Sequence, residues 1–270
     1  MLTELLGKGG QVCQAAKEGQ LRCPLIVRPT SEDVITGNLF GTLRAVNPRW
    51  WLPQLLNRAL GADRFRQQVF RRLEIQLWKN RPPYPRNLLP WDEGSTQVDV
   101  TITWENPPTT VFIEMKYGAD LSAKTSGDNG RHGYPSDQLI RNIRVGLLEC
   151  GWFQRGRMVQ VPPRDFAVIV LGPTKGHPLV ETYRNSEKLR TAIPHDDKLI
   201  GLPRLPFVGE AAYRDVADVL REQERWVTRC ERVLTDDLIN YLGFKLSHRP
   251  NERHVSCPKL PFPALYDINT

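Results

Sequence analysis

Residues 98–117 contain two short runs that are rich in apolar and β-branched side chains, at 98–103 and 111–117. The Asn-Pro-Pro sequence at 106–108 separates them, and both residue types favour turns. Runs of this length and composition on either side of a turn are typical of a β-hairpin. This hairpin restricts the fold more than any other segment, because it defines two neighbouring strands of a sheet.

One register of the hairpin places apolar side chains opposite apolar side chains on one face of the sheet. If the turn is centred on the bond 106–107, Val100 faces Ile113, so that apolar side chains meet on one face. On the other face, Asp99 then lies opposite Glu114. Because register is set by matching faces, this agreement supports the pairing. The sequence therefore predicts two carboxylates on opposed residues, whose Cβ atoms are about 4.5–5.5 Å apart.

Two opposed carboxylates require a cation, because like charges destabilise a strand pair. Lys116 follows Glu114 by two residues and therefore lies on the same face of the strand. Oxygen-only ligands suit a hard ion, Mg²⁺ or Mn²⁺, and not zinc. Such an ion polarises a phosphoryl oxygen and lowers the pKa of water, and a lysine orients that water or offsets charge on phosphorus. The hairpin therefore predicts a site for phosphoryl chemistry.

The competing interpretation is a surface hairpin in which Glu114 and Lys116 only neutralise each other. Residues 111–113 are apolar and flank this pair. They favour a mostly buried strand, where charged side chains need a specific role.

Periodic patterns predict further elements around the hairpin, and we find no linker that would require a second domain. A helical stripe is expected at 31–46 and again after the hairpin, and a continuous apolar run is typical of a strand that is covered on both faces. In chain order we expect helices at 31–46 and 52–60, a strand at 69–78, a loop at 79–96, strands at 98–103 and 111–117, a loop at 118–134, a helix at 137–150, a strand at 166–171, helices at about 181–191 and 210–242, and extended chain at 250–263.

The order helix, strand, strand, strand, helix, strand, with Asp99 and the triplet Glu114-Met115-Lys116, resembles the PD-(D/E)xK superfamily of restriction-endonuclease-like nucleases. The resemblance covers about residues 31–172. It implies an α/β fold whose mixed central sheet is flanked by helices. Residues 1–270 would form a single domain with a C-terminal helical extension at about 180–270.

The resemblance also implies roles for the residues of the hairpin. Asp99 and Glu114 would bind the metal ion, and the backbone carbonyl of Met115 would add a further ligand. Lys116 would be the catalytic lysine. Val98 stands where the name of the family has proline, which is a departure from the pattern.

Two helical residues match further positions of the family. Glu32 corresponds to the acid on the first core helix, which binds the metal directly or through water, and Gln138 to a polar residue on the helix after the triplet. Each has a simpler interpretation, Glu32 as an acid that favours the helix dipole and Gln138 as a solvent-exposed residue of a first turn. Asn142 occupies the tyrosine position of the Gln-x-x-x-Tyr signature, so that signature is not matched.

Positive charge is concentrated in one part of the chain, whose net charge is +7. Residues 58–86 hold eight Lys or Arg and two Asp or Glu, with aromatic residues between them. Such a segment suits a polyanion such as nucleic acid, although an ordinary solvated surface gives the same pattern. The arginines expected to follow phosphates are Arg64, Arg66, Arg71 and Arg72.

Together these features predict a Mg²⁺- or Mn²⁺-dependent nuclease that acts on nucleic acid, most simply double-stranded DNA. A restriction or phage-defence role is implied by the resemblance alone. The alternatives are a DNA-binding protein of this fold without turnover, and a transposase-type strand-cleaving subunit that acts with a partner protein; a homo-oligomer is also compatible. Five cysteines without a CxxC pair, and no apolar run of about 20 residues, predict a cytoplasmic protein without a membrane partner.

Overall fold

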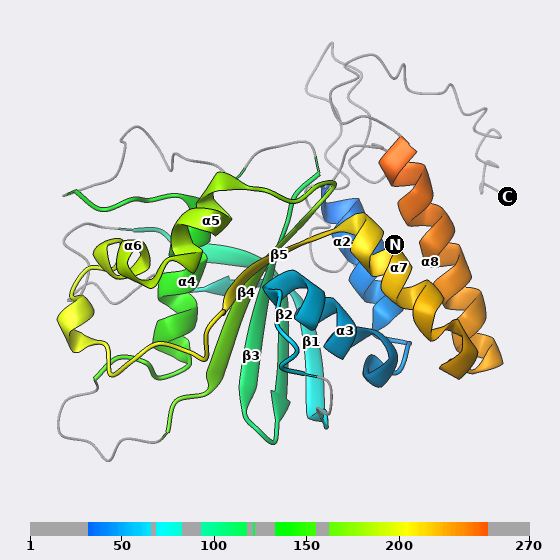
Figure 1. Cartoon of the computed structure of the whole chain (residues 1–270), viewed down its shortest axis with the longest axis horizontal. Helices are drawn as coiled ribbons and strands as arrows, with labels where there is room; N and C mark the ends of the chain where they lie inside the picture. The colour runs from blue at the N-terminus through cyan, green and yellow to red at the C-terminus, as the bar shows by residue number, and fades with distance from the viewer. Residues whose placement is uncertain are drawn as a thin grey trace, which may run out of the picture.

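The computed structural model describes residues 32–65, 69–82, 93–117, 121, 133–154 and 162–247 (Figure 1). Within them, five strands form one sheet in the order β1-β2-β3-β4-β5. β2 is antiparallel to both β1 and β3, whereas β4 is parallel to both β3 and β5. The strands are β1 (Arg71–Arg81), β2 (Thr96–Glu105), β3 (Thr109–Met115), β4 (Asp165–Gly172) and β5 (Val208–Ala212).

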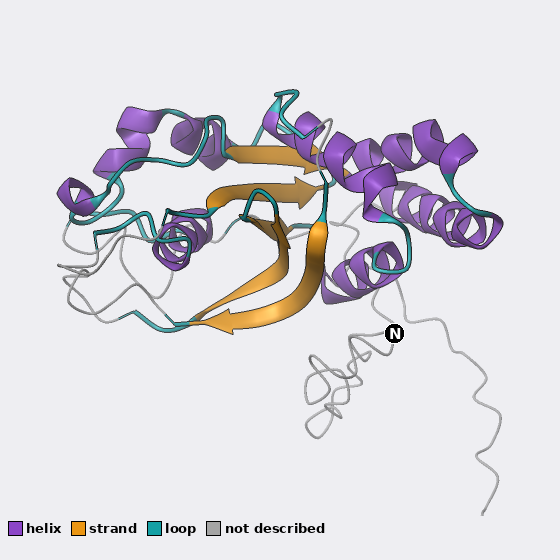
Figure 2. Cartoon of the chain, turned by 90° about the horizontal axis from the view of Figure 1, so that it is seen from below, coloured by secondary structure: helices purple, strands orange, loops and turns teal. Residues whose placement is uncertain are grey.

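Helices flank this open, mixed sheet, so the α/β class expected from the sequence is confirmed. Figure 1 shows α4, α5 and α6 on one side of the strands and α2, α3, α7 and α8 on the other, and Figure 2 shows that the antiparallel strands are strongly curved. The α-helices are α2 (Glu32–Leu43), α3 (Pro48–Leu60), α4 (Gln138–Glu149), α5 (Pro178–Arg184), α6 (Ser186–Thr191), α7 (Tyr213–Gln223) and α8 (Arg229–Ser247), and the 3-10 helices are η2 (Asp196–Lys198) and η3 (Glu224–Trp226).

The predicted hairpin is formed by β2 and β3, and its register is as the sequence predicts for the residues from Val100 to Thr103. The paired residues begin at Val100, one position after Asp99. Val100 lies opposite Ile113, and Ile102 lies opposite Val111. All four side chains are buried. A shift of one residue would move this whole apolar set to the opposite face, so the pattern fixes the register.

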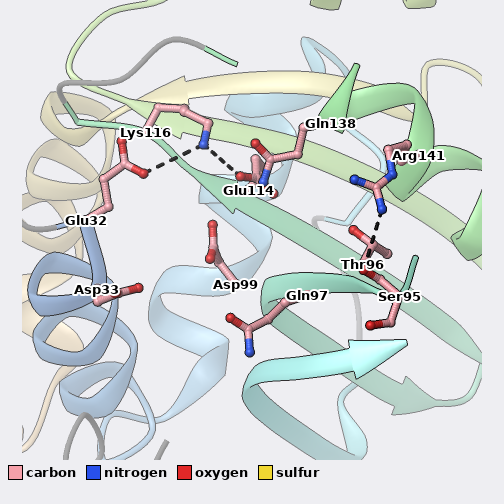
Figure 3. Close-up of a pocket in the computed structure, with 10 residues that line it drawn as sticks. All are labelled: Glu32, Asp33, Ser95, Thr96, Gln97, Asp99, Glu114, Lys116, Gln138 and Arg141. Carbon is pink, nitrogen blue, oxygen red and sulfur yellow. Dashed lines mark hydrogen bonds and ion pairs between the residues drawn. The ribbon is translucent and has the colours of Figure 1, made fainter. Parts of the chain in front are cut away.

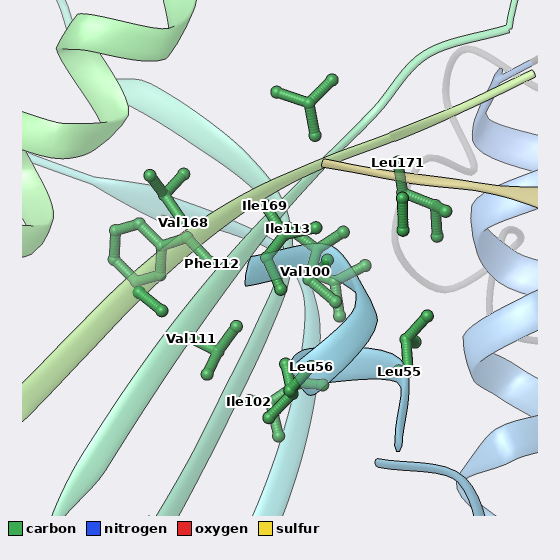
Figure 4. Close-up of a cluster of buried hydrophobic side chains, with 14 of the residues drawn as sticks. Leu55, Leu56, Val100, Ile102, Val111, Phe112, Ile113, Val168, Ile169 and Leu171 are labelled. Carbon is green, nitrogen blue, oxygen red and sulfur yellow. The ribbon is translucent and has the colours of Figure 1, made fainter. Parts of the chain in front are cut away.

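The hydrophobic core lies on both sides of the sheet. Figure 4 shows Leu56 of α3 beside Ile102 of β2, within a buried cluster that also includes Leu55 and residues of β3 and β4. On the α4 side, the ring of Phe112 packs edge-on against Phe166 at 5.1 Å between centroids. The hairpin is therefore enclosed between helices, and the interpretation of it as a surface hairpin is wrong.

Two glycines allow helices to approach the sheet closely. A Cβ atom on Gly146 of α4 would lie 2.1 Å from the ring of Phe166 in β4. A Cβ atom on Gly209 of β5 would lie 2.5 Å from the carbonyl oxygen of Ala59 in α3. Any side chain at these positions would push the helices away from the sheet, so the glycines set the height of α4 above β4 and of α3 above β5.

The expectation of helix at about 210–242 is wrong at its start, and the helical part is divided into α7 and α8. Residues 208–212 form β5, a fully buried edge strand beside β4. Its sequence, Val-Gly-Glu-Ala-Ala, has low strand propensity and leads directly into the amphipathic helix α7. Tertiary burial overrides propensity here, as is common for strands.

Two further boundaries differ from the sequence-based expectation. β1 continues to Arg81, into the segment expected as the loop 79–96. The helix expected at 181–191 is two helices, because Asn185 is extended and its side chain caps α6 by accepting the N–H groups of Glu187 and Lys188.

Several expectations fall on residues that the structure does not describe. These are the extended chain at 250–263, most of the loop at 118–134 and the Pro-rich part of 79–96. Among the helices of the described ranges, none has both the length and the apolar composition needed to cross a membrane.

Candidate functional site

A polar pocket of about 400 Å³ lies where α2, β2, β3 and α4 meet. It contains the side chains of four of the residues that the sequence singles out as metal ligands or catalytic groups, together with Gln138 (Figure 3). Segments more than 100 residues apart in sequence, from α2 to α4, are thus brought together. The residues that line the pocket are Glu32, Asp33, Ser95, Thr96, Gln97, Asp99, Glu114, Lys116, Gln138 and Arg141.

Lys116 is the central cation of this pocket. Its Nζ lies 2.9 Å from Oε1 of Glu114 and 3.7 Å from Oε2 of Glu32. Burial alone would lower the pKa of Lys116, but the attraction of Glu114 and Glu32, with a smaller part from Asp99, outweighs it and raises this pKa. The lysine is therefore charged at neutral pH and is held between two carboxylates.

Glu114 is fully buried on β3. Its Oε2 accepts a hydrogen bond of 2.9 Å from Nδ2 of Asn142, whereas Oε1 has the ion pair with Lys116 but no hydrogen bond of good geometry. Burial raises the pKa of Glu114; the charge of Lys116 and the hydrogen bonds offset this in part, and the charge of Glu32 adds to it. A buried carboxylate of this kind gains strongly from a cation.

Asp99 connects the two strands of the hairpin at the pocket. Its Oδ2 accepts a hydrogen bond of 2.9 Å from the backbone N–H of Met115. In an extended strand the N–H and C=O groups of one residue point to the same side, so the Met115 carbonyl is directed toward β2 as well. The residues that the sequence proposes as ligands on β2 and β3 are therefore neighbours.

Glu32 reaches the hairpin from the first turn of α2. Its Oε1 accepts a hydrogen bond of 2.9 Å from the backbone N–H of Tyr117, and its other oxygen faces Lys116. The dipole of α2 favours an acid at this position. The carboxylate nevertheless does more than complement the helix dipole, because it contacts the end of β3.

Gln138 is the first residue of α4 and lines the pocket. The preceding residue, Asp137, caps α4 by accepting the N–H of Ile140 at 3.0 Å, and it also accepts a hydrogen bond from the hydroxyl of Tyr183. Asp137 thus links the N-terminus of α4 to α5, and this link holds Gln138, the next residue, at the pocket.

Sequence reasoning missed three residues that support the site. Asn142 donates to Glu114, and Thr96 in turn donates to Asn142. Tyr213 donates its hydroxyl to the backbone carbonyl of Lys116 at 2.5 Å. Only Asn142 carried a usable signal, since it lies one helical turn after Gln138 and therefore on the same face of α4.

The basic segment does not behave as one phosphate-binding surface. The guanidinium of Arg64 is buried and donates to the carbonyl oxygens of Arg204 and Pro206, and it pairs with Asp165. Arg81 is buried as well, and it pairs with Glu149. The expectation that Arg64 follows phosphates is therefore wrong, because its donors are used within the fold.

The other arginines that were expected to follow phosphates differ in their positions. Arg71 and Arg72 are exposed on β1 and remain candidates for a phosphate contact. Arg66 lies outside the described residues. Arg141, which lines the pocket, pairs with Glu93 at 3.0 Å and donates to the carbonyl oxygen of Gly94.

The chemistry of the pocket fits a hard divalent cation. Its lining has four carboxylates against two cationic side chains, an excess of two negative charges. Its oxygen ligands are of the kind that Mg²⁺ and Mn²⁺ prefer, and the only close polar contact of Oε1 of Glu114 among the described residues is the ion pair with Lys116. In the described part of the chain, no three His, Cys, Asp or Glu side chains are yet grouped to hold an ion. The Lys116 ammonium instead takes the place beside Glu114 that a metal ion requires.

Comparison with protein-family models, with curated proteins and with solved structures finds no match to this chain.

Proposed function

We propose that this chain is a divalent-metal-dependent nuclease of the PD-(D/E)xK type, which hydrolyses phosphodiester bonds in double-stranded DNA. The observation that supports this best is the meeting of Asp99, Glu114 and Lys116 in one polar pocket at the end of a buried hairpin. Buried charged side chains are costly, and a fold that gathers them around a pocket uses them for binding or chemistry.

The carboxylates and one carbonyl of the site would hold the ion. Asp99 and Glu114 contribute carboxylate oxygens, Met115 contributes its backbone carbonyl, and Glu32 binds directly or through a water molecule. When bound, Mg²⁺ or Mn²⁺ polarises a phosphoryl oxygen and lowers the pKa of a water molecule.

Lys116 would act on the reacting groups themselves. Its ammonium orients the attacking water and offsets the negative charge that builds on the phosphorus as the water oxygen bonds to it and the bond to the leaving oxygen breaks. Gln138 starts α4, and the positive end of that helix dipole favours a phosphate in the pocket.

One observation favours a second candidate, a strand-cleaving subunit that becomes active only with a partner. The ammonium of Lys116 contacts Oε1 of Glu114, and it must leave this oxygen before a metal ion can bind there. A partner protein, a second copy of the chain or the nucleic acid itself would supply the energy for that change.

The experiment is incubation of the full chain with supercoiled plasmid and with linear duplex DNA, in Mg²⁺, in Mn²⁺ and in EDTA. We expect cleavage that depends on the metal and is lost in EDTA and in Asp99→Asn. Equal cleavage by wild type and Asp99→Asn would contradict the proposal. Cleavage only after addition of a host-cell extract, and not by Asp99→Asn in that extract, would favour the partner-dependent candidate.

We place this activity in the cytoplasm. A reducing cytoplasm suits the five cysteines, of which Cys150 and Cys230 lie in the described ranges as free thiols. Restriction or defence against phage is the role that the resemblance supports.

A further inference from the structure

The buried amide of Asn142 lies between Glu114 on β3 and Thr96 on β2. Nδ2 of Asn142 in α4 donates to Oε2 of Glu114 at 2.9 Å, and Oδ1 of the same side chain accepts from the hydroxyl of Thr96 at 3.1 Å. The exposed fractions of Glu114, Asn142 and Thr96 are 0%, 0% and 5%. The three side chains form one short hydrogen-bonded chain from β3 through α4 to β2.

Glu114 fixes which way this amide points, and Thr96 holds the other end of it. The oxygen and nitrogen of an asparagine amide have almost the same shape, so its orientation follows from its hydrogen-bond partners. A carboxylate accepts hydrogen bonds and cannot donate them, so the Nδ2 group must face Glu114. The hydroxyl of Thr96 can donate to Oδ1, which completes the only arrangement in which both contacts are favourable.

The amide therefore assigns different tasks to the two oxygens of Glu114. Oε2 is held by a neutral donor, which adds no positive charge beside the carboxylate. Oε1 is left to the cation side of the pocket, where the Lys116 ammonium lies 2.9 Å away. A lysine or arginine at position 142 would also hold the carboxylate. It would, however, add a second positive charge beside Glu114, next to Lys116, and so weaken the attraction of Glu114 for a metal ion.

We infer that Asn142, held at its amide oxygen by Thr96, is a positioning residue that presents Oε1 of Glu114 to the metal ion. This inference rests on the proposed metal site, and Asn142 acts on that site only through Glu114. Groups that orient metal ligands in this way typically contribute about 10–100-fold to metal affinity.

The test measures Mn²⁺ binding to the intact chain by calorimetry without nucleic acid. We expect Asn142→Leu to raise the Kd for Mn²⁺ by about 10–100-fold. Thr96→Val keeps the shape of the side chain but removes the hydroxyl, and we expect a smaller rise in Kd. Thr96→Ser keeps the hydroxyl and is expected to bind Mn²⁺ as the wild type does.

Thr235→Val is the matched control for loss of a buried threonine hydroxyl. Thr235 is 1% exposed in α8 and donates to the carbonyl oxygen of Arg232, away from the pocket. We expect it to lower the melting temperature as much as Thr96→Val does and to leave the Kd for Mn²⁺ unchanged. If Thr235→Val raises the Kd for Mn²⁺ as much as Thr96→Val does, the effect follows from lost stability alone, and the positioning role is wrong.

The remaining outcomes separate this role from the proposed function. If the wild type binds Mn²⁺ and folded Asn142→Leu binds it equally well, the positioning role is wrong and the proposed function stands. If Asn142→Leu does not fold, Thr96→Val decides, and a wild-type Kd in that variant overturns the role. If the wild type binds no Mn²⁺, the metal site and the positioning role are both wrong.

Discussion

Tyr213, the first residue of α7, donates its hydroxyl to the backbone carbonyl of Lys116 across 2.5 Å, although 97 residues separate the two in sequence. The backbone N–H of Lys116 donates to the carbonyl oxygen of Leu171 in β4 at 2.8 Å. The main chain of the lysine is thus held from two sides. The position of its ammonium depends on β4 and α7 as well as on the hairpin.

Tyr213→Phe is expected to slow DNA cleavage more than it destabilises the fold. Loss of one hydrogen bond lowers the free energy of unfolding by about 1 kcal/mol, whereas a displaced catalytic group slows a reaction by up to about 10²-fold. Cleavage rates and urea denaturation measure the two effects. Tyr241→Phe removes a hydroxyl from a ring that packs against Lys245, and serves as the control that retains wild-type cleavage.

Metal binding is expected to raise the melting temperature. A ligand at one hundred times its Kd stabilises the folded state by about 2.7 kcal/mol. Mg²⁺ or Mn²⁺ is therefore expected to raise the melting temperature of the wild type, and to have much less effect on Asp99→Asn. An equal rise in both proteins would place the bound ion elsewhere than at the hairpin.

The stability of the chain is expected to rise with pH above pH 8 because of Lys245. This side chain is 2% exposed beside the rings of Tyr117 and Tyr241, and burial lowers its pKa to about 8 from 10.5. Between these two values the unfolded chain binds a proton that the folded chain lacks, so the free energy of unfolding increases with pH. The increase is at most about 1.4 kcal/mol per pH unit.

Lys245→Met isolates this contribution from other titrating groups. Urea denaturation between pH 7.5 and 9.5 is the measurement, and the expected result is a steeper rise of stability with pH in the wild type than in the variant. Parallel curves would mean that the folded protein keeps Lys245 protonated throughout this range.

The arginines of the basic segment are expected to separate into two groups. Arg64→Gln removes two hydrogen bonds from a charged group to backbone carbonyls, and hydrogen bonds of charged groups contribute about 1.5–3 kcal/mol each. The variant is expected to be less stable, with the salt dependence of DNA binding unchanged. Replacement of Arg71 and Arg72 together by Gln is expected to reduce the salt slope of DNA binding by about two, with stability unchanged. The reverse assignment would contradict the buried position of Arg64.

The parts of the fold that depend on short-range patterns could be predicted from the sequence. Val100 and Ile113 face each other because a turn and an alternating pattern lie within 20 residues and fix the register. β5 could not be predicted, because Gly209 and its small neighbours form a strand only where β4 and α3 enclose them. Burial of Arg64 was equally hidden, since charge composition does not reveal which donors the fold uses.

The residues of the candidate site that match the family pattern could be predicted from the sequence. The contacts between side chains that are distant in sequence could not. Asp99, Glu114 and Glu32 follow from the pattern and the element order, and they line one pocket. The contact of Thr96 with Asn142 joins residues 46 positions apart through side chains alone. Neither periodicity nor spacing reports such a pairing, because it depends on the curvature of the sheet and the height of α4 above it.

The rate of plasmid cleavage by Lys116→Ala in saturating Mn²⁺ decides whether this pocket is a nuclease site. We expect a folded protein that binds duplex DNA and cleaves it at least about 10²-fold more slowly than wild type, the effect of removing one preorganised electrostatic group. Lys116→Arg is expected to restore little, because a planar guanidinium cannot place a single donor at the same point. Cleavage by Lys116→Ala at close to the wild-type rate would contradict the assignment of this pocket as a nuclease site.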